Sequence, residues 1–150
     1  MSALPRHIAE RECDVIRRKA NWPASCLRVV EVERPVGPGN VVMIELAYKN
    51  ATEIFTGIGK RGVSAEQVAN RLYREAKAFL KTDVPVGEFL ADQLMLPMGL
   101  AASQGQASSF RTQSLSSHSK THIDILKLFL DIDVHAESKS DDSVVVRFKT

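Results

Sequence analysis

The chain has 150 residues and a formal net charge of +2, so it can form one ordinary domain or two small ones, and its charge alone indicates no nucleic-acid partner. Its two cysteines are far apart and form no CxxC pair, which argues against a disulfide framework or a cysteine zinc site and favours the reducing cytoplasm. No apolar run approaches the roughly 20 residues of a membrane helix and no signal-peptide core opens the chain, so we expect a soluble cytoplasmic protein without membrane contact.

The first half of the chain predicts two helices and three strands. The helices are expected where apolar residues recur at helical spacing, over residues 5–20 and 64–80. Ser64 followed by Gln67 is a capping box, which marks the start of the second helix. The strands are expected where apolar residues alternate with charged ones or form short runs between turn residues, over residues 27–33, 41–48 and 53–58.

The second half predicts a different order: helix, strand, helix, strand, strand. An apolar helix over residues 86–102 is followed by a polar loop over 103–109. The remaining strand, helix and two strands are expected over residues 110–115, 119–130, 132–136 and 144–148. Pro85 interrupts the pattern, so we place a domain boundary there, with one α/β domain over residues 1–82 and a second over residues 83–150.

Phe89, Asp92 and Gln93 stand at positions i, i+3 and i+4 of a predicted helix and therefore share a face. The carboxylate needs a partner, because burying it alone in an apolar helix is costly. An aromatic ring beside a carboxylate and an amide suits a nucleotide. The alternative is an ordinary helix start, with Asp92 stabilised by the helix dipole and Gln93 in solvent.

His118 follows two serines at the start of the next helix, where free backbone N–H groups gather anions. The same field disfavours the imidazolium, and neutral imidazole is a competent nucleophile toward phosphorus. The alternative is a surface histidine next to a helix cap. His118 and His122 also have the i, i+4 spacing of a two-histidine metal site, but no third ligand is evident, so we expect no metal site here.

Five short motifs occur in an order typical of one known family. They are LPRHIAERE at residues 4–12, GPGN at 37–40, GKRGVSAE at 59–66, VGEFLADQL at 86–94 and SSH at 116–118. The fourth is the most specific and continues to Leu96-Pro97-Met98. Each motif alone is weak, but together they resemble the RNA 3'-terminal phosphate cyclase family from Leu4 to about Leu130.

The resemblance implies an ATP-dependent ligase of RNA processing. Family members use ATP and a divalent cation, Mg or Mn, to convert RNA 3'-phosphate ends into 2',3'-cyclic phosphates. A histidine becomes adenylylated, the adenylyl group passes to the RNA 3'-phosphate, and the neighbouring 2'-hydroxyl closes the ring and expels AMP. By position, His118 matches the catalytic nucleophile, whereas Phe89, Asp92 and Gln93 match the nucleotide-binding segment.

The resemblance also implies a fold of repeated βαβαββ units, with a smaller α/β domain inserted in the last one. Residues 1–82 would be the inserted domain, and residues 83–150 the carboxy-terminal part of the repeat domain, which carries the nucleotide site. Roughly the first half of a usual member is absent, with other residues that line the nucleotide and RNA sites. We therefore expect the chain alone to be inactive.

The sequence departs from the family pattern at two places. Phe89 stands where the pattern often has tyrosine, and Ser119-Lys120-Thr121-His122 replaces the commoner Leu-Leu-Thr-Asn. Two other functions stay open. One is a non-catalytic, cyclase-like protein of RNA processing or ribosome assembly, although such relatives lack the nucleophilic histidine and this chain keeps His118. The other is a truncated binding module. Nothing in the sequence indicates an oligomeric state.

Overall fold

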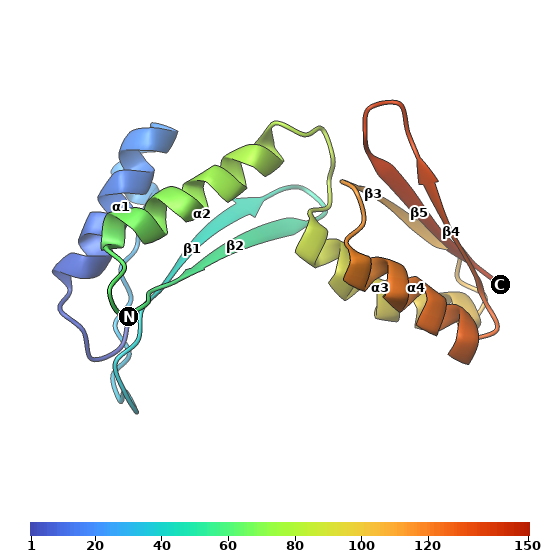
Figure 1. Ribbon diagram of the computed structural model, residues 1–150, viewed down its shortest axis with the longest axis horizontal. Coiled ribbons are helices and arrows are strands. Elements are labelled where there is room, and N and C mark those ends of the chain that lie inside the picture. Colours follow the sequence, from blue (N-terminus) through green and yellow to red (C-terminus); the bar gives the residue numbers. More distant parts are fainter. The chain divides into compact units, whose positions relative to one another are not determined.

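The computed structural model describes residues 1–150 and contains four α-helices, one short 3-10 helix and five strands (Figure 1). The chain forms two compact units, residues 1–48 with 54–81 and residues 49–53 with 82–150. Helices and strands occur in both units, so the fold is of the mixed α/β (α+β) class that the sequence predicts. No helix combines the length and the apolar character that crossing a membrane requires.

The first unit contains α1 (His7–Ala20), α2 (Ala65–Leu80), the 3-10 helix η1 (Ala24–Cys26) and β1 (Val41–Ala47). It also contains β2 (Thr52–Ile58), which pairs with β1, except for the first two residues of that strand. The predicted capping box is confirmed, because Ser64 Oγ accepts from the Gln67 N–H and Gln67 Oε1 accepts from the Ser64 N–H. The core of this unit consists of apolar side chains from α1, α2 and β1: Val15, Ile16, Val42, Ile44, Val68, Ala69, Leu72 and Ala76.

The strand predicted over residues 27–33 is wrong. This stretch has no regular structure, and no strand lies beside it. Its ladder-like backbone hydrogen bonds reach only Met1, from the Val32 N–H to the Met1 carbonyl and from the Met1 amino group to the Val30 carbonyl. An alternating sequence becomes a strand only where another strand pairs with it, so Val30 and Val32 stay exposed.

Glu12 is a carboxyl group on the buried side of α1. Its side chain is 1% exposed, and Oε1 accepts a 2.7 Å hydrogen bond from Asn40 Nδ2, while Asn40 Oδ1 has no partner. Burial raises the pKa of Glu12 and outweighs the opposing effect of the Asn40 hydrogen bond. A folded-state pKa above the unfolded value stabilises the fold at acidic pH, and this contribution is lost as the pH rises through the folded-state pKa.

We expect Glu12→Gln to raise the free energy of unfolding at about pH 7 by ~1 kcal/mol. The uncharged amide keeps the acceptor for Asn40 Nδ2 and brings N–H groups that can donate to Asn40 Oδ1. At about pH 4 the wild-type carboxyl is largely protonated, so the difference should nearly vanish. Urea unfolding at both pH values measures the effect. A gain of the same size at both would show that ionisation of Glu12 is not its cause.

The second unit places two helices against a three-stranded antiparallel sheet (Figure 1). Its elements follow the predicted order and are α3 (Glu88–Ser103), β3 (Ser108–Thr112), α4 (Ser117–Phe129), β4 (Asp133–Ser138) and β5 (Val144–Lys149). The strand order is β3-β5-β4, so β4 is an edge strand. The core lies between the helices and the sheet and includes Met95, Phe110, Leu126, Val134, Val146 and Phe148.

The boundaries of β3 and α4 differ from the prediction. β3 begins at Ser108, inside the stretch expected to be a loop, and ends at Thr112 instead of Leu115. The cause is pairing with β5, which provides partners from Ser108 opposite Phe148 to Thr112 opposite Val144. α4 begins at Ser117, two residues before the predicted start, because Ser116 is its N-cap.

Candidate functional site

α4 begins at a serine cap, which places His118 in the first turn of the helix. Ser116 Oγ accepts a 3.0 Å hydrogen bond from the Ser119 N–H and so satisfies one of the free donors at the helix start. The His118 side chain is 77% exposed. The local sequence therefore presents an imidazole to solvent in a capped first turn of the helix.

The structure brings Asp92 of α3 to His118 of α4. Asp92 Oδ1 lies 2.7 Å from His118 Nδ1, across a separation of 26 residues in the sequence. An ionised carboxylate can only accept a hydrogen bond, so the proton of a neutral imidazole lies on Nδ1. Nε2 is then left with its lone pair. A carboxylate that fixes the tautomer in this way also orients the ring.

Asp92 is the centre of a small polar network. His122 Nδ1 and Ser119 Oγ each lie 3.5 Å from the same oxygen, Oδ1. Ser119 is 1% exposed, and its hydroxyl accepts a 3.0 Å hydrogen bond from Ser116 Oγ. The helix cap is thus connected through Ser119 to the carboxylate, which restricts the position of Asp92 beside the histidine.

The pKa of Asp92 is lowered from its ordinary value. Partial burial alone would raise it, but the hydrogen bonds and charges of His118 and His122 together outweigh burial. Asp92 is therefore ionised at neutral pH and remains an acceptor for the proton on His118 Nδ1.

Phe89 and Gln93 lie outside this network. The Phe89 ring is 71% exposed, and the Gln93 side chain is also exposed. The three residues predicted to share a face are therefore used differently: Asp92 contacts α4, whereas Phe89 and Gln93 remain accessible on α3. Both side chains are therefore accessible to a ligand.

Ser119 and the contact between His122 and Asp92 carry little signal in the sequence. The spacing from Ser116 to Ser119 indicates a cap, but contact with Asp92 depends on how α3 packs against α4, which neither helix encodes alone.

Residues 1–150 contain no group of three or more His, Cys, Asp or Glu side chains placed to hold a metal ion. These residues therefore form no ready ligand set for the divalent cation that the resemblance implies.

Comparison with known proteins identifies one family. The sequence model of RNA 3'-terminal phosphate cyclase matches residues 12–136, which is most of the chain. The chain belongs to the RNA 3'-terminal phosphate cyclase family. The resemblance read from the five motifs is confirmed.

Curated RNA 3'-terminal phosphate cyclases show how much of the family's length the chain spans. The cyclase of Ectopseudomonas mendocina is 36% identical over 131 residues, that of Pseudomonas fluorescens 34% over 146, and that of Koribacter versatilis 37% over 132. These alignments cover 87%, 97% and 88% of this chain, but only 37%, 42% and 36% of the relatives. The chain thus spans about two fifths of the length of these cyclases.

Proposed function

We propose that the chain provides the nucleophile of an ATP-dependent RNA 3'-terminal phosphate cyclase, and that His118 is this nucleophile. The observation that carries the proposal is the 2.7 Å contact between Asp92 Oδ1 and His118 Nδ1. It leaves Nε2 of an exposed imidazole as the free nitrogen. Family membership supports the reaction class, since the relatives are named RNA 3'-terminal phosphate cyclase.

In the first step, the Nε2 lone pair attacks the α-phosphorus of ATP. The new N–P bond forms as the bond from the α-phosphorus to the bridging oxygen of pyrophosphate breaks, and pyrophosphate leaves. Positive charge develops on the imidazole during this attack. Asp92 stabilises it through the Nδ1–H hydrogen bond and holds the ring in line with the leaving group.

In the second step, an oxygen of the RNA 3'-phosphate attacks the adenylyl phosphorus, and the N–P bond breaks. His118 is released with its Nε2 lone pair. The neighbouring 2'-hydroxyl then attacks the activated 3'-phosphorus, loses its proton and expels AMP, which leaves a 2',3'-cyclic phosphate. Asp92 and Ser119 keep their places throughout, so the same tautomer of His118 is ready for the next ATP.

Phe89 and Gln93 are proposed to bind the nucleotide. An exposed aromatic ring offers a face on which adenine can stack, a contact worth about 1–3 kcal/mol for a base. Gln93 offers both an acceptor and donors for ribose hydroxyls or a base edge. Phe89 lacks the hydroxyl of tyrosine, so its contribution is stacking alone.

The two cysteines are free thiols, in keeping with a cytoplasmic site of action.

The experiment is incubation with ATP labelled in the α-phosphate, followed by detection of label bound covalently to protein. It is run on the 150-residue chain and on a chimaera in which this chain replaces the matching part of the Ectopseudomonas mendocina cyclase. We expect adenylylation and cyclisation in the chimaera and no cyclisation by the chain alone. A chimaera that folds and binds ATP but takes up no label would refute the proposal.

A further inference from the structure

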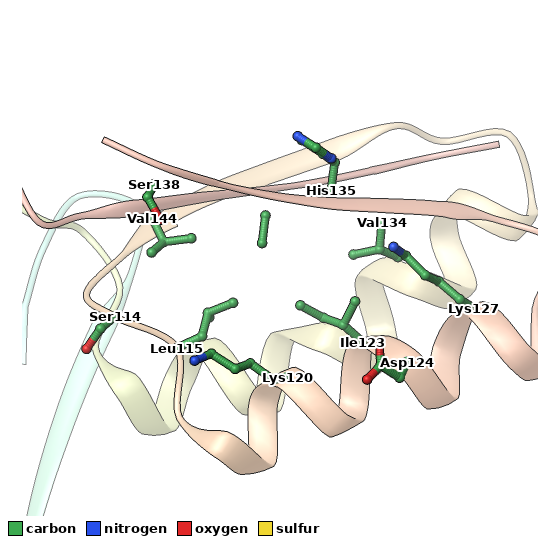
Figure 2. A pocket seen from close by; sticks show the side chains of 11 residues that line it. Ser114, Leu115, Lys120, Ile123, Asp124, Lys127, Val134, His135, Ser138 and Val144 are labelled. Atoms are coloured by element: carbon green, nitrogen blue, oxygen red, sulfur yellow. The ribbon is translucent and has the colours of Figure 1, made fainter. Parts of the chain in front are cut away.

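A groove of about 470 Å³ lies between α4 and the edge strand β4 (Figure 2), and neither Asp92 nor His118 lines it. Its floor is apolar and includes Ile123, Val134 and Val144. Lys120 and Lys127, both on α4, line the helical wall (Figure 2). None of these side chains belongs to the network around His118, so the groove is a separate feature.

The groove is present because β4 continues beyond the part of the sheet that α4 covers. Val134 and Ala136 alternate along β4 and so belong to the same face of the sheet. Val134 is 1% exposed beneath the helix, whereas Ala136 is exposed and its small side chain leaves space. His135 also borders the groove, but its ring projects from the side of β4 opposite Ile123 and Lys120 (Figure 2).

The charges of the second unit are distributed unevenly. Among the six Lys and Arg side chains of residues 82–150, four are paired with carboxylates: Arg111, Lys139, Arg147 and Lys149. The two that form no ion pair are Lys120 and Lys127, the two that line the groove. Asp124 lies between them on α4 and pairs with neither, so the groove keeps a net positive charge. Residues 82–150 thus leave their unpaired cations at one place, the groove.

Lys120 and Lys127 are two helical turns apart, about 10 Å along the axis of α4. That spacing suits successive charges of an extended polyanion better than one small anion. An apolar floor beneath the two cations can contact sugars and the faces of bases. Single-stranded nucleic acids are commonly held in this way, with cations on the backbone and apolar surface beneath the bases.

The position of the groove favours RNA over an acidic peptide. Ser114 and Leu115 line its end and directly precede Ser116, the cap of the helix that carries His118. One end of the groove therefore lies at the end of α4 that carries His118. We propose that the groove binds the sugar-phosphate backbone of the RNA upstream of its 3'-phosphate. This inference rests on the proposed function for the identity of the substrate.

Binding of a fluorescent single-stranded RNA to the 150-residue chain, followed by anisotropy at several salt concentrations, tests the groove. The double variant Lys120→Gln/Lys127→Gln should raise Kd about tenfold and reduce the slope of log affinity against log salt by about 1, as expected for lost phosphate contacts. The matched control is Lys139→Gln/Lys149→Gln, which removes the same charge from carboxylate-paired lysines outside the groove. Its Kd should stay within about twofold of wild type.

Ala136→Glu is a second variant, which places a carboxylate in the groove at an exposed position. It should also weaken RNA binding. The proposal fails if the groove variants bind RNA as wild type does, or if the control pair weakens binding equally. It also fails if polyglutamate displaces RNA at equal concentration of charge, because an acidic peptide would then be the better ligand.

Adenylylation of the chimaera by ATP without RNA separates this inference from the proposed function. The groove variants should be labelled as fast as wild type, since that step needs no RNA. If RNA binding by the chimaera depends on Lys120 and Lys127 but the chimaera takes up no label, the RNA groove is supported and the assignment of His118 as nucleophile is refuted. If labelling is normal but RNA binding does not change when the two lysines are replaced, the nucleophile is supported and the RNA groove is refuted.

Discussion

His118→Asn in the chimaeric cyclase is expected to abolish both the adenylyl-enzyme and cyclisation of an RNA 3'-phosphate. Asparagine can keep hydrogen bonds of the imidazole but has no nitrogen lone pair that can attack phosphorus. ATP binding should persist, because the proposed nucleotide contacts are on α3. The loss of labelling should exceed about 10³-fold, since covalent chemistry is removed rather than weakened. Covalent labelling with ATP and equilibrium binding of ATP measure the two effects separately.

His122→Asn is the matched control for this prediction. It is the same substitution on the same helix, and His122 also reaches Asp92 Oδ1, although at 3.5 Å instead of 2.7 Å. Its effect should be far milder, because asparagine is common at this place in the family pattern. The label should be a phosphoramidate, labile to acid and stable to alkali. Label on a lysine such as Lys120, or labelling that survives in His118→Asn, would show that the nucleophile is misassigned.

Local signals predicted most of the fold. The capping box at Ser64 and the helical spacing of the apolar residues after it predicted α2. Both signals depend only on residues three or four positions apart in the sequence. The strand predicted over residues 27–33 failed for the converse reason, since a strand depends on a partner that its own sequence does not contain. The shifted start of β3 at Ser108 has the same origin in pairing with β5.

The candidate site shows the same division between local and long-range information. Spacing alone brought out Asp92 and His118 as separate features, each with an ordinary explanation as a helix-start residue. Their contact depends on the packing of α3 against α4, and it gives the carboxylate the partner that an apolar helix requires. The sequence also could not predict that Lys120 and Lys127 form no ion pair, because this depends on where every nearby carboxylate lies in the fold.

Asp92→Asn in the chimaeric cyclase should slow adenylylation by about 10³-fold, with a much smaller effect on the KM for ATP. The amide has the size of the carboxylate but can present an N–H to His118 Nδ1. That contact favours the tautomer with the proton on Nε2, which has no lone pair there for the α-phosphorus. Asp92→Ala should also slow the step, because the ring loses its orientation and the developing positive charge loses its partner. Both variants should keep the fold, since the Asp92 side chain is 29% exposed.

Two comparisons show whether Asp92 acts through His118. Ser119→Ala removes one of the two partners that lie 3.5 Å from the carboxylate and should change the rate by less than about tenfold. Asp92→Glu keeps the charge and should restore part of the rate lost in Asp92→Asn. If Asp92 instead contacts ATP alone, its variants would raise the KM and leave the rate at saturating ATP near wild type. A rate and an ATP dependence that both match wild type would remove Asp92 from the site.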